Sequence, residues 1–182
     1  MRKSIILALY SVFLVGFSLP PVMSGARASE STLAVTGIVV ASGCQVDTGS
    51  VDQNVKIGTF TAKDFPSVGS TSSFKAMNIN LSKCYSGLTT VQVTFSGVTD
   101  ADNPGLLAIT DTGVGGTLAT GVGVELLDNG GKNIPLDTKG TQTFELDEGN
   151  NTLSFLLRYK STRYPVTSGE ASAVMYFDLA YP

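Results

Sequence analysis

Apolar and polar residues alternate with a period of two along most of this chain, which limits its possible folds more than any other feature. A period of two places successive side chains on opposite faces of a β-strand, whereas a helix repeats about every 3.6 residues. Clusters of Gly, Asn, Asp, Ser and Thr interrupt the alternation at short intervals. The pattern predicts an all-β sandwich and no convincing helix. The expected inward-facing residues are Val55 and Ile57; Met77, Ile79 and Leu81; Val91, Val93 and Phe95; Val122, Val124 and Leu126; Leu153, Phe155, Leu157 and Tyr159; and Ala173, Met175, Phe177, Leu179 and Tyr181.

Two segments between these strands have the composition of connections. Residues 113–123 are rich in Gly and Thr and contain few apolar side chains, so they predict a mobile connection. Residues 128–131 have the sequence Asp-Asn-Gly-Gly, which is typical of a hairpin turn.

The first 28 residues are typical of a cleaved export signal. Arg2 and Lys3 precede an apolar run over residues 5–19, and the small residues of 26–28 favour cleavage before Ser29. The run stops at Pro20, whereas a membrane-spanning helix needs about 20 apolar residues. Residues 29–182 would then form one domain, which is large enough to bury a core.

Charge and cysteine content narrow the possible partners. The predicted leader contains three of the 12 basic residues and none of the 15 acidic ones, so its removal changes the net charge from −3 to −6. A chain this acidic is a poor partner for nucleic acid. Cys44 and Cys84 are the two cysteines, and in an exported chain they predict a structural disulfide. The chain has no His, so we expect no metal and no cofactor.

No group of residues predicts catalysis. A Ser-His-Asp or Cys-His arrangement is impossible without His. The carboxylate pairs Asp147–Glu148 and Asp100–Asp102 lie beside Gly, Asn or Pro, which favours solvated turns. We therefore expect a protein that is not an enzyme, and a secreted hydrolase is kept only as an alternative.

The segment before the first cysteine is a strand with no obvious hairpin partner. Leu33, Val35, Gly37 and Val39 share one of its faces. Periodicity alone favours pairing within the chain's own sheet, and pairing with another molecule is the alternative. At the other end, core-type side chains continue to Tyr181, although terminal residues are usually polar.

Several segments together resemble the pilin subunits of chaperone-usher fimbriae, especially the type 1 kind. The resemblance extends over residues 29–182, and the combination of motifs is specific although each one alone is weak. The matching segments are 43–53 around the first cysteine, 79–84 before the second, 121–128 in the middle, and 155–159, 166–171 and 177–181 near the C-terminus.

The resemblance implies an incomplete immunoglobulin-like β-sandwich that lacks its last strand and carries an N-terminal donor-strand extension, residues 29–43, ahead of a pilin domain, residues 44–182. The donor residues would be Leu33, Val35, Gly37 and Val39. The acceptor and chaperone-binding groove would contain Gly169, Met175, Phe177, Leu179 and Tyr181, where Gly169 and Tyr181 match the family's chaperone-recognition pattern. Such a subunit passes through the periplasm with a chaperone, meets an outer-membrane usher and joins neighbouring pilin subunits in a cell-surface fimbrium that supports adhesion.

Two departures from the family pattern refine these expectations. The chain ends in Tyr181-Pro182, whereas the family more often ends in Tyr-Gln, which can change how the chaperone grips the terminal carboxylate. The short extension is most like that of a minor or adaptor subunit. A carbohydrate-binding fimbrial adhesin is the alternative function, but residues 29–182 leave no room for a separate lectin domain.

Overall fold

The domain is built from two antiparallel sheets. The computed structural model describes residues 43–113, 116–136 and 138–182. The strands are β1 (Gln45–Val46), β2 (Lys75–Cys84), β3 (Thr90–Gly97), β4 (Leu107–Ala108), β5 (Val122–Asp128), β6 (Gln142–Glu145), β7 (Gly149–Ser161) and β8 (Met175–Ala180). The helical elements are α1 (Thr48–Val51), η1 (Ala62–Asp64) and η2 (Thr138–Gly140).

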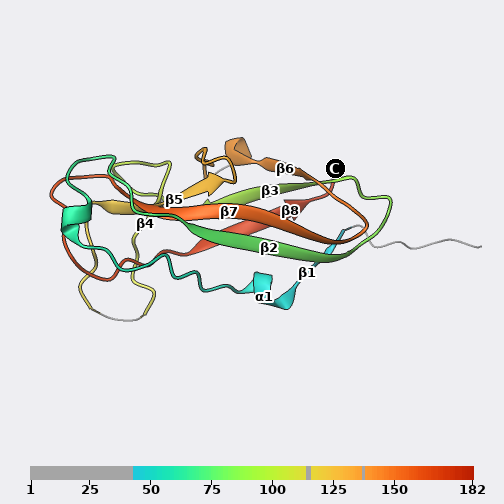
Figure 1. The fold of residues 1–182 in the computed structure, drawn as a ribbon, viewed down its shortest axis with the longest axis horizontal. Helices are drawn as coiled ribbons and strands as arrows, with labels where there is room; N and C mark the ends of the chain where they lie inside the picture. Colours follow the sequence, from blue (N-terminus) through green and yellow to red (C-terminus); the bar gives the residue numbers. More distant parts are fainter. Residues whose placement is uncertain (1–42, 114–115, 137) are drawn as a thin grey trace, which may run out of the picture. The chain divides into compact units, whose positions relative to one another are not determined.

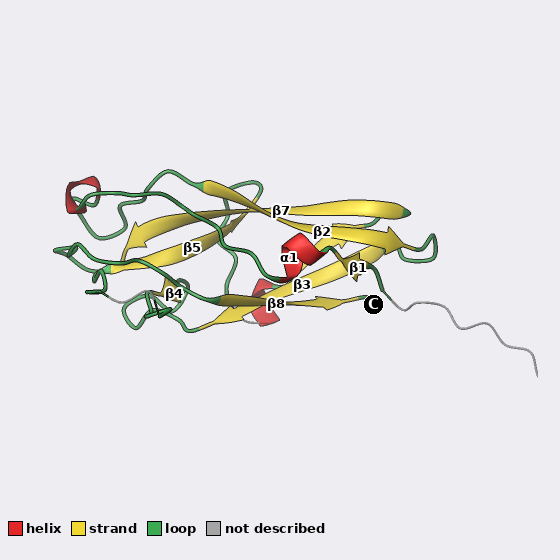
Figure 2. Ribbon diagram, turned by 90° about the horizontal axis from the view of Figure 1, so that it is seen from below, coloured by secondary structure: helices red, strands yellow, loops and turns green. Residues whose placement is uncertain are grey.

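The larger sheet has the strand order β1-β2-β7-β5-β4 and the smaller sheet the order β6-β3-β8. Figure 1 shows most of the long strands lying along a common axis, and Figure 2 shows β3 and β8 in one layer with β2, β5 and β7 in the other. The two inner faces form the core, as in immunoglobulin-like sandwiches.

Aromatic side chains from both sheets meet at the centre of the core. Phe95 of β3 and Phe155 of β7 are fully buried, and their rings pack edge to face with centroids 4.8 Å apart. Phe144 of β6 packs edge-on against Phe155 at 5.5 Å. Each aromatic pair stabilises the fold by about 0.5–1.5 kcal/mol beyond the contribution of the apolar area that it buries.

Most of the predicted strands are confirmed. Along β2, β3 and β7 the predicted inner side chains are mostly buried and alternate with more exposed ones. Residues 128–131 form the predicted turn, which is closed by a hydrogen bond from Gly131 N to Asp128 O. The expected strand at Val55 and Ile57 was wrong in one respect. These side chains are half-buried in alternation, but residues 53–60 belong to no ladder in the described part of the chain. The one-turn helix α1 and the two short 3₁₀ helices were also not expected.

The two ends of the sandwich, the disulfide end and the far end, differ. At the disulfide end, β2 finishes at Cys84, opposite Gly149 at the start of β7. Cys44 and Cys84 form a disulfide there, as predicted, with their Cα atoms 4.3 Å apart. At the far end, β7 finishes at Ser161, opposite Val122 at the start of β5. Figure 1 has the disulfide end, with the C-terminus, on the right.

Two features are absent from residues 43–182, apart from the three residues that the structure does not describe. Within that range no helix has the length and apolar composition needed to cross a bilayer. The same range contains no cluster of three His, Cys, Asp or Glu side chains placed to hold a metal ion.

Candidate strand-acceptor groove

Strand β8 lies at the edge of the smaller sheet. Its ladder with β3 runs from Met175 opposite Gly97 to Ala180 opposite Gln92, and no other described strand pairs with it. Its inner row, Met175, Phe177 and Leu179, packs against the core but is only half-buried. An edge strand with unpaired backbone groups and half-exposed apolar side chains is a template for pairing with another strand.

An open groove of about 1120 Å³ runs beside this edge. One wall is β8 with the extended segment before it, from Val166 to Phe177. The opposite wall is the unpaired segment from Gln53 to Thr61, where Val55 and Ile57 are half-buried. The floor consists of apolar core residues from the larger sheet and its connections. These floor residues include Met77, Ile79, Leu107, Val122, Val124 and Leu157.

The wall formed by residues 53–61 is fixed at both of its ends. Before it, Gln53 Nε2 donates to the carbonyl oxygen of Asn78 in β2 at 2.9 Å. After it, the carboxylate of Asp64 in η1 holds Thr61, because Asp64 Oδ2 accepts hydrogen bonds from Thr61 N at 2.7 Å and from the Thr61 hydroxyl at 3.0 Å. These two hydrogen bonds, the backbone one first, hold the pKa of Asp64 below its ordinary value. The segment thus stays extended without a ladder.

Tyr159 of β7 links the floor to the wall before β8. Its hydroxyl donates a hydrogen bond to the carbonyl oxygen of Ala171. Burial of the phenol raises the pKa of Tyr159, and the negative charge of Glu170 raises it further. Because the rest of the floor is apolar, this groove suits an extended apolar segment.

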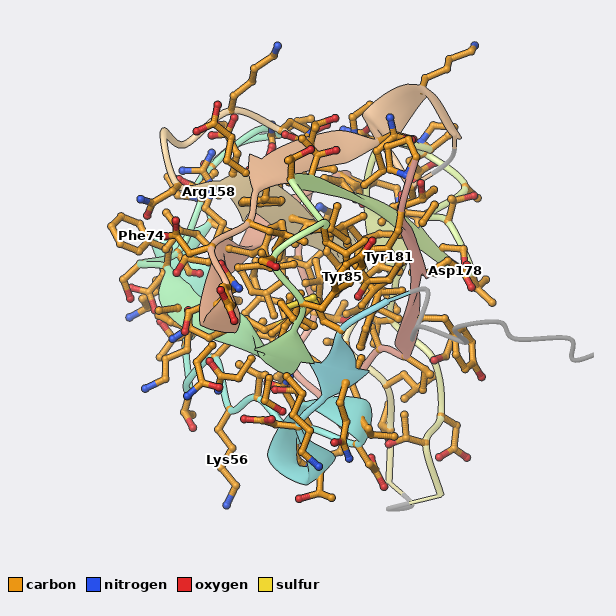
Figure 3. The ribbon with its side chains drawn as sticks, turned by 90° about the vertical axis from the view of Figure 1, so that its right-hand side faces the viewer. Lys56, Phe74, Tyr85, Arg158, Asp178 and Tyr181 are labelled. Carbon is orange, nitrogen blue, oxygen red and sulfur yellow. A yellow bond between two sulfur atoms is a disulfide. The ribbon has the colours of Figure 1, made fainter. Side chains whose placement is uncertain are left out.

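The five residues predicted for the acceptor groove lie in different places. Gly169, Met175 and Phe177 line the groove, whereas Leu179 and Tyr181 are half-buried towards the disulfide end. A Cβ atom at Gly43 would lie 2.7 Å from the ring of Tyr181, so this ring covers the start of the described chain. Figure 3 views the disulfide end directly and labels Tyr85 and Tyr181 there.

Gly169 has a clear packing role in the wall. A Cβ atom there would collide with the carbonyl oxygen of Thr117 and with the backbone of Leu118 and Ala119. The neighbouring bridges, Leu118 to Glu170 and Thr120 to Thr167, tie the same two segments together. A glycine is therefore needed for this close backbone approach.

Sequence reasoning missed the second wall of the groove. Val55 and Ile57 were assigned to a strand but not to the site, and Phe60, whose ring packs edge-on to Tyr159 at 6.0 Å, was not singled out. The usable signal was an alternating segment with no hairpin partner nearby. The predicted donor residues Leu33, Val35, Gly37 and Val39 lie outside the described residues.

This fold places the chain in the class of incomplete immunoglobulin-like β-sandwiches, with an edge strand beside an open groove. The family model described as "Fimbrial protein" matches residues 32–182. The chain is 40% identical to the fimbrial-like protein YcbU of Escherichia coli (strain K12), over 95% of this chain and 97% of that protein. It is 37% identical to a type-1 fimbrial protein subunit of Serratia marcescens, over 87% and 90%. Among solved structures, the P pilus rod subunit PapA has the same fold, with a TM-score of 0.64 at 24% identity over 77% of this chain and 99% of PapA.

The chain therefore belongs to the fimbrial protein family. It is a structural subunit of a bacterial fimbrium, where it joins neighbouring subunits. The resemblance to chaperone-usher pilins is confirmed, and the adhesin alternative is not favoured.

Proposed function

We propose that this subunit polymerises by donor-strand exchange, in which the N-terminal extension of one subunit fills the groove of the next. The observation that carries the proposal is the half-exposed inner row of β8 beside the open groove. Leu33, Val35 and Val39 supply the apolar side chains, and Gly37 fits where a larger side chain would collide. Donor-strand complementation of pilins is an established example of β-strand addition.

The donor strand is expected to run antiparallel to β8. Every ladder between the described strands is antiparallel, and this pairing is slightly more stable per residue than the parallel one. The contact between Gly43 and Tyr181 supports the same direction, because it puts the root of the outgoing extension at the end where β8 finishes. An antiparallel donor keeps its own domain away from that root, so the contact repeats head to tail and builds a filament.

The route to the fimbrium completes the proposal. The subunit is exported to the periplasm, where a chaperone covers the groove, and it then passes to an outer-membrane usher. The groove needs this cover, because an exposed strand edge promotes aggregation. In this proposal Gly169 and Tyr181 serve chaperone recognition, and Gly169 does so by letting the wall before β8 lie flat. The domain would support cell adhesion as a minor or adaptor subunit, without catalytic activity of its own.

A synthetic peptide of residues 29–43 tests the donor role. Added to the purified subunit at about 100 times its dissociation constant, it should stabilise the fold by about 2.7 kcal/mol. Calorimetry and thermal unfolding measure the binding and the stabilisation. Absence of binding would refute the donor role.

Two peptide variants define the working face of the donor. Gly37→Arg should abolish binding, because moving an unpaired charged side chain from water into an apolar groove carries a large free-energy penalty. Thr36→Arg places the same charge on the opposite face and should bind nearly as well as the parent. Equal behaviour of the two variants would contradict the assignment of Leu33, Val35, Gly37 and Val39 to the working face.

A further inference from the structure

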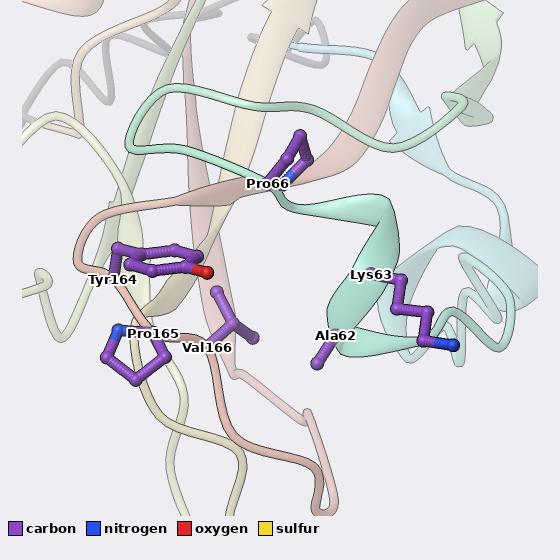
Figure 4. A pocket seen from close by; sticks show the side chains of 6 residues that line it. All are labelled: Ala62, Lys63, Pro66, Tyr164, Pro165 and Val166. Atoms are coloured by element: carbon purple, nitrogen blue, oxygen red, sulfur yellow. The ribbon is translucent and has the colours of Figure 1, made fainter.

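A second hollow lies at the far end of the sandwich, with a volume of about 380 Å³. Figure 4 shows the six side chains that line it: Ala62, Lys63, Pro66, Tyr164, Pro165 and Val166. One half of the hollow is formed by η1 and the segment after it, and the other half by the loop after β7. Hydrogen bonds hold these segments together, including one from Gly69 N to Ser161 O at 2.9 Å. We call this hollow the far-end pocket.

The far-end pocket continues the groove. Ala62 and Val166 line both hollows, so a strand leaving the groove in this direction emerges beside the pocket. This exit is at the opposite end of the wall from Tyr181, because the wall runs from Val166 through Met175 into β8.

We infer that the far-end pocket is a docking site for the disulfide end of a second copy of this chain. The inference rests on the proposed donor-strand exchange and adds to it a contact between the two folded domains. An antiparallel donor leaves the groove at the far end, and only four residues separate Val39, the last of the proposed donor residues, from Cys44. Five residue steps span at most about 18 Å. The disulfide end of the incoming copy therefore has to lie near the pocket.

The chemistry of the two surfaces is complementary. The pocket is mostly apolar, including Tyr164 with 62% of its area exposed, and Lys63 stands at its rim with its side chain directed away from Tyr164 and Val166 (Figure 4). Lys63 has no ion-pair partner among the described residues. The disulfide end presents Tyr85, which is 41% exposed, and the exposed carboxylates of Asp147 and Glu148. The exposed aromatic fits the apolar part of the pocket, and the two acids fit Lys63.

This contact gives the pocket a role separate from strand insertion. The donor strand holds the two copies together, whereas the docked domains fix the angle between them. Loss of the contact should leave peptide binding intact and should change only how whole subunits hold each other.

Zero-length carbodiimide cross-linking of fibres assembled from the full chain tests the contact directly. We expect intermolecular cross-links from Lys63 to Asp147 or Glu148, identified by mass spectrometry, and none in the monomer. Lys132, an exposed lysine in the turn after β5, is the internal control and should form no such link. Fibres in which Lys63 links to neither acid would overturn the docking site.

Charge variants provide a second readout that does not need the Lys63 amine. Lys63→Glu should speed dissociation of whole subunits about two- to fivefold, as for an exposed ion pair, while Lys132→Glu should not. Combining Lys63→Glu with Asp147→Lys and Glu148→Lys should restore the original rate. Equal rates for Lys63→Glu and Lys132→Glu, or no restoration, would overturn the proposal.

The peptide of residues 29–43 separates the two possible failures. If it binds wild type and Lys63→Glu equally but the cross-links and rate changes are absent, the docking site is wrong and donor-strand exchange stands. If the peptide does not bind wild type, donor-strand exchange fails, and the docking site fails with it.

Discussion

Strands β7 and β8 have almost the same apolar pattern but very different surroundings. In β7 the row Leu153, Phe155 and Leu157 is buried, with at most 6% of each residue exposed. The corresponding row of β8, Met175, Phe177 and Leu179, is only half-buried. The difference comes from their neighbours, because β7 pairs with both β2 and β5, whereas β8 pairs with β3 alone among the described strands. In this fold, the half-buried row of β8 belongs to the candidate strand-acceptor groove, whereas the row of β7 belongs to the closed core.

Truncation of the two phenylalanines should give the largest effect and test this contrast. Phe155→Ala should lower the free energy of unfolding by about 4 kcal/mol, as expected for a fully buried ring. Phe177→Ala should cost roughly a third of that in the free subunit, because its ring is partly in solvent already. Denaturant unfolding of the full chain measures both values.

The donor peptide sharpens the same experiment. When the peptide of residues 29–43 is bound, the cost of Phe177→Ala should rise, while that of Phe155→Ala should stay nearly constant. Equal costs in the free subunit, or no change on peptide binding, would contradict the view that β8 awaits a neighbour.

The outer faces of β5 and β8 differ in the same way. Glu125 of β5 is 2% exposed and accepts hydrogen bonds from Arg158 Nε at 2.6 Å and from Lys160 Nζ at 2.8 Å. Asp178 of β8 points away from the sandwich and is exposed (Figure 3). Glu125→Gln should cost about 2 kcal/mol, because it leaves two partly buried cations without their carboxylate. Asp178→Asn is the matched control and should change stability by less than about 0.5 kcal/mol.

The Glu125 cluster also predicts a dependence on pH. Burial raises the pKa of Glu125, but the hydrogen bonds and charges of Lys160 and Arg158 outweigh it and leave this pKa below the ordinary value of 4.5. The folded state then holds its proton less tightly than the unfolded state. The contribution is complete above the ordinary value and is lost as the pH falls through the lowered pKa. As the pH falls through this range, the free energy of unfolding of the wild type should decrease more than that of Glu125→Gln. The same pH dependence in both proteins would contradict this prediction.

The sequence predicted the strands well because a period of two records which side of a strand is buried. It could not predict ladders, since pairing depends on distant segments. Val55 and Ile57 alternate like a strand, yet no described strand lies beside them. The burial of Glu125 was equally hidden, because its partners are 33 and 35 residues away in sequence.

The candidate site was predictable only in part for the same reason. The row of β8 was identified from its pattern and from the family resemblance, but half-burial cannot be read from residues that match those of β7. The opposite wall needed the folded structure, since Phe60 reaches the groove by packing against Tyr159.

The smallest expected effect concerns the bond that ties β7 to the segment before β8. Tyr159→Phe removes the hydrogen bond from its hydroxyl to the Ala171 carbonyl and should cost about 1 kcal/mol. Tyr176→Phe on the outer face of β8, where Tyr176 is 66% exposed, should cost almost nothing. Equal losses for the two variants would show that the Tyr159 bond does not support the wall.

Titration to alkaline pH distinguishes this bond from simple packing. Burial and the charge of Glu170 raise the pKa of Tyr159 above its ordinary value of 10.0, so the folded state retains the phenolic proton longer than the unfolded state. The stabilisation is therefore complete below pH 10 and is lost as the pH rises through the raised pKa. Wild type should lose stability over this range relative to Tyr159→Phe, and the loss should be accompanied by weaker binding of the 29–43 peptide, because the wall before β8 is then no longer tied to the floor. A wild type that tracks Tyr159→Phe throughout would mean that the wall is held by its bridges at Glu170 and Thr167 alone.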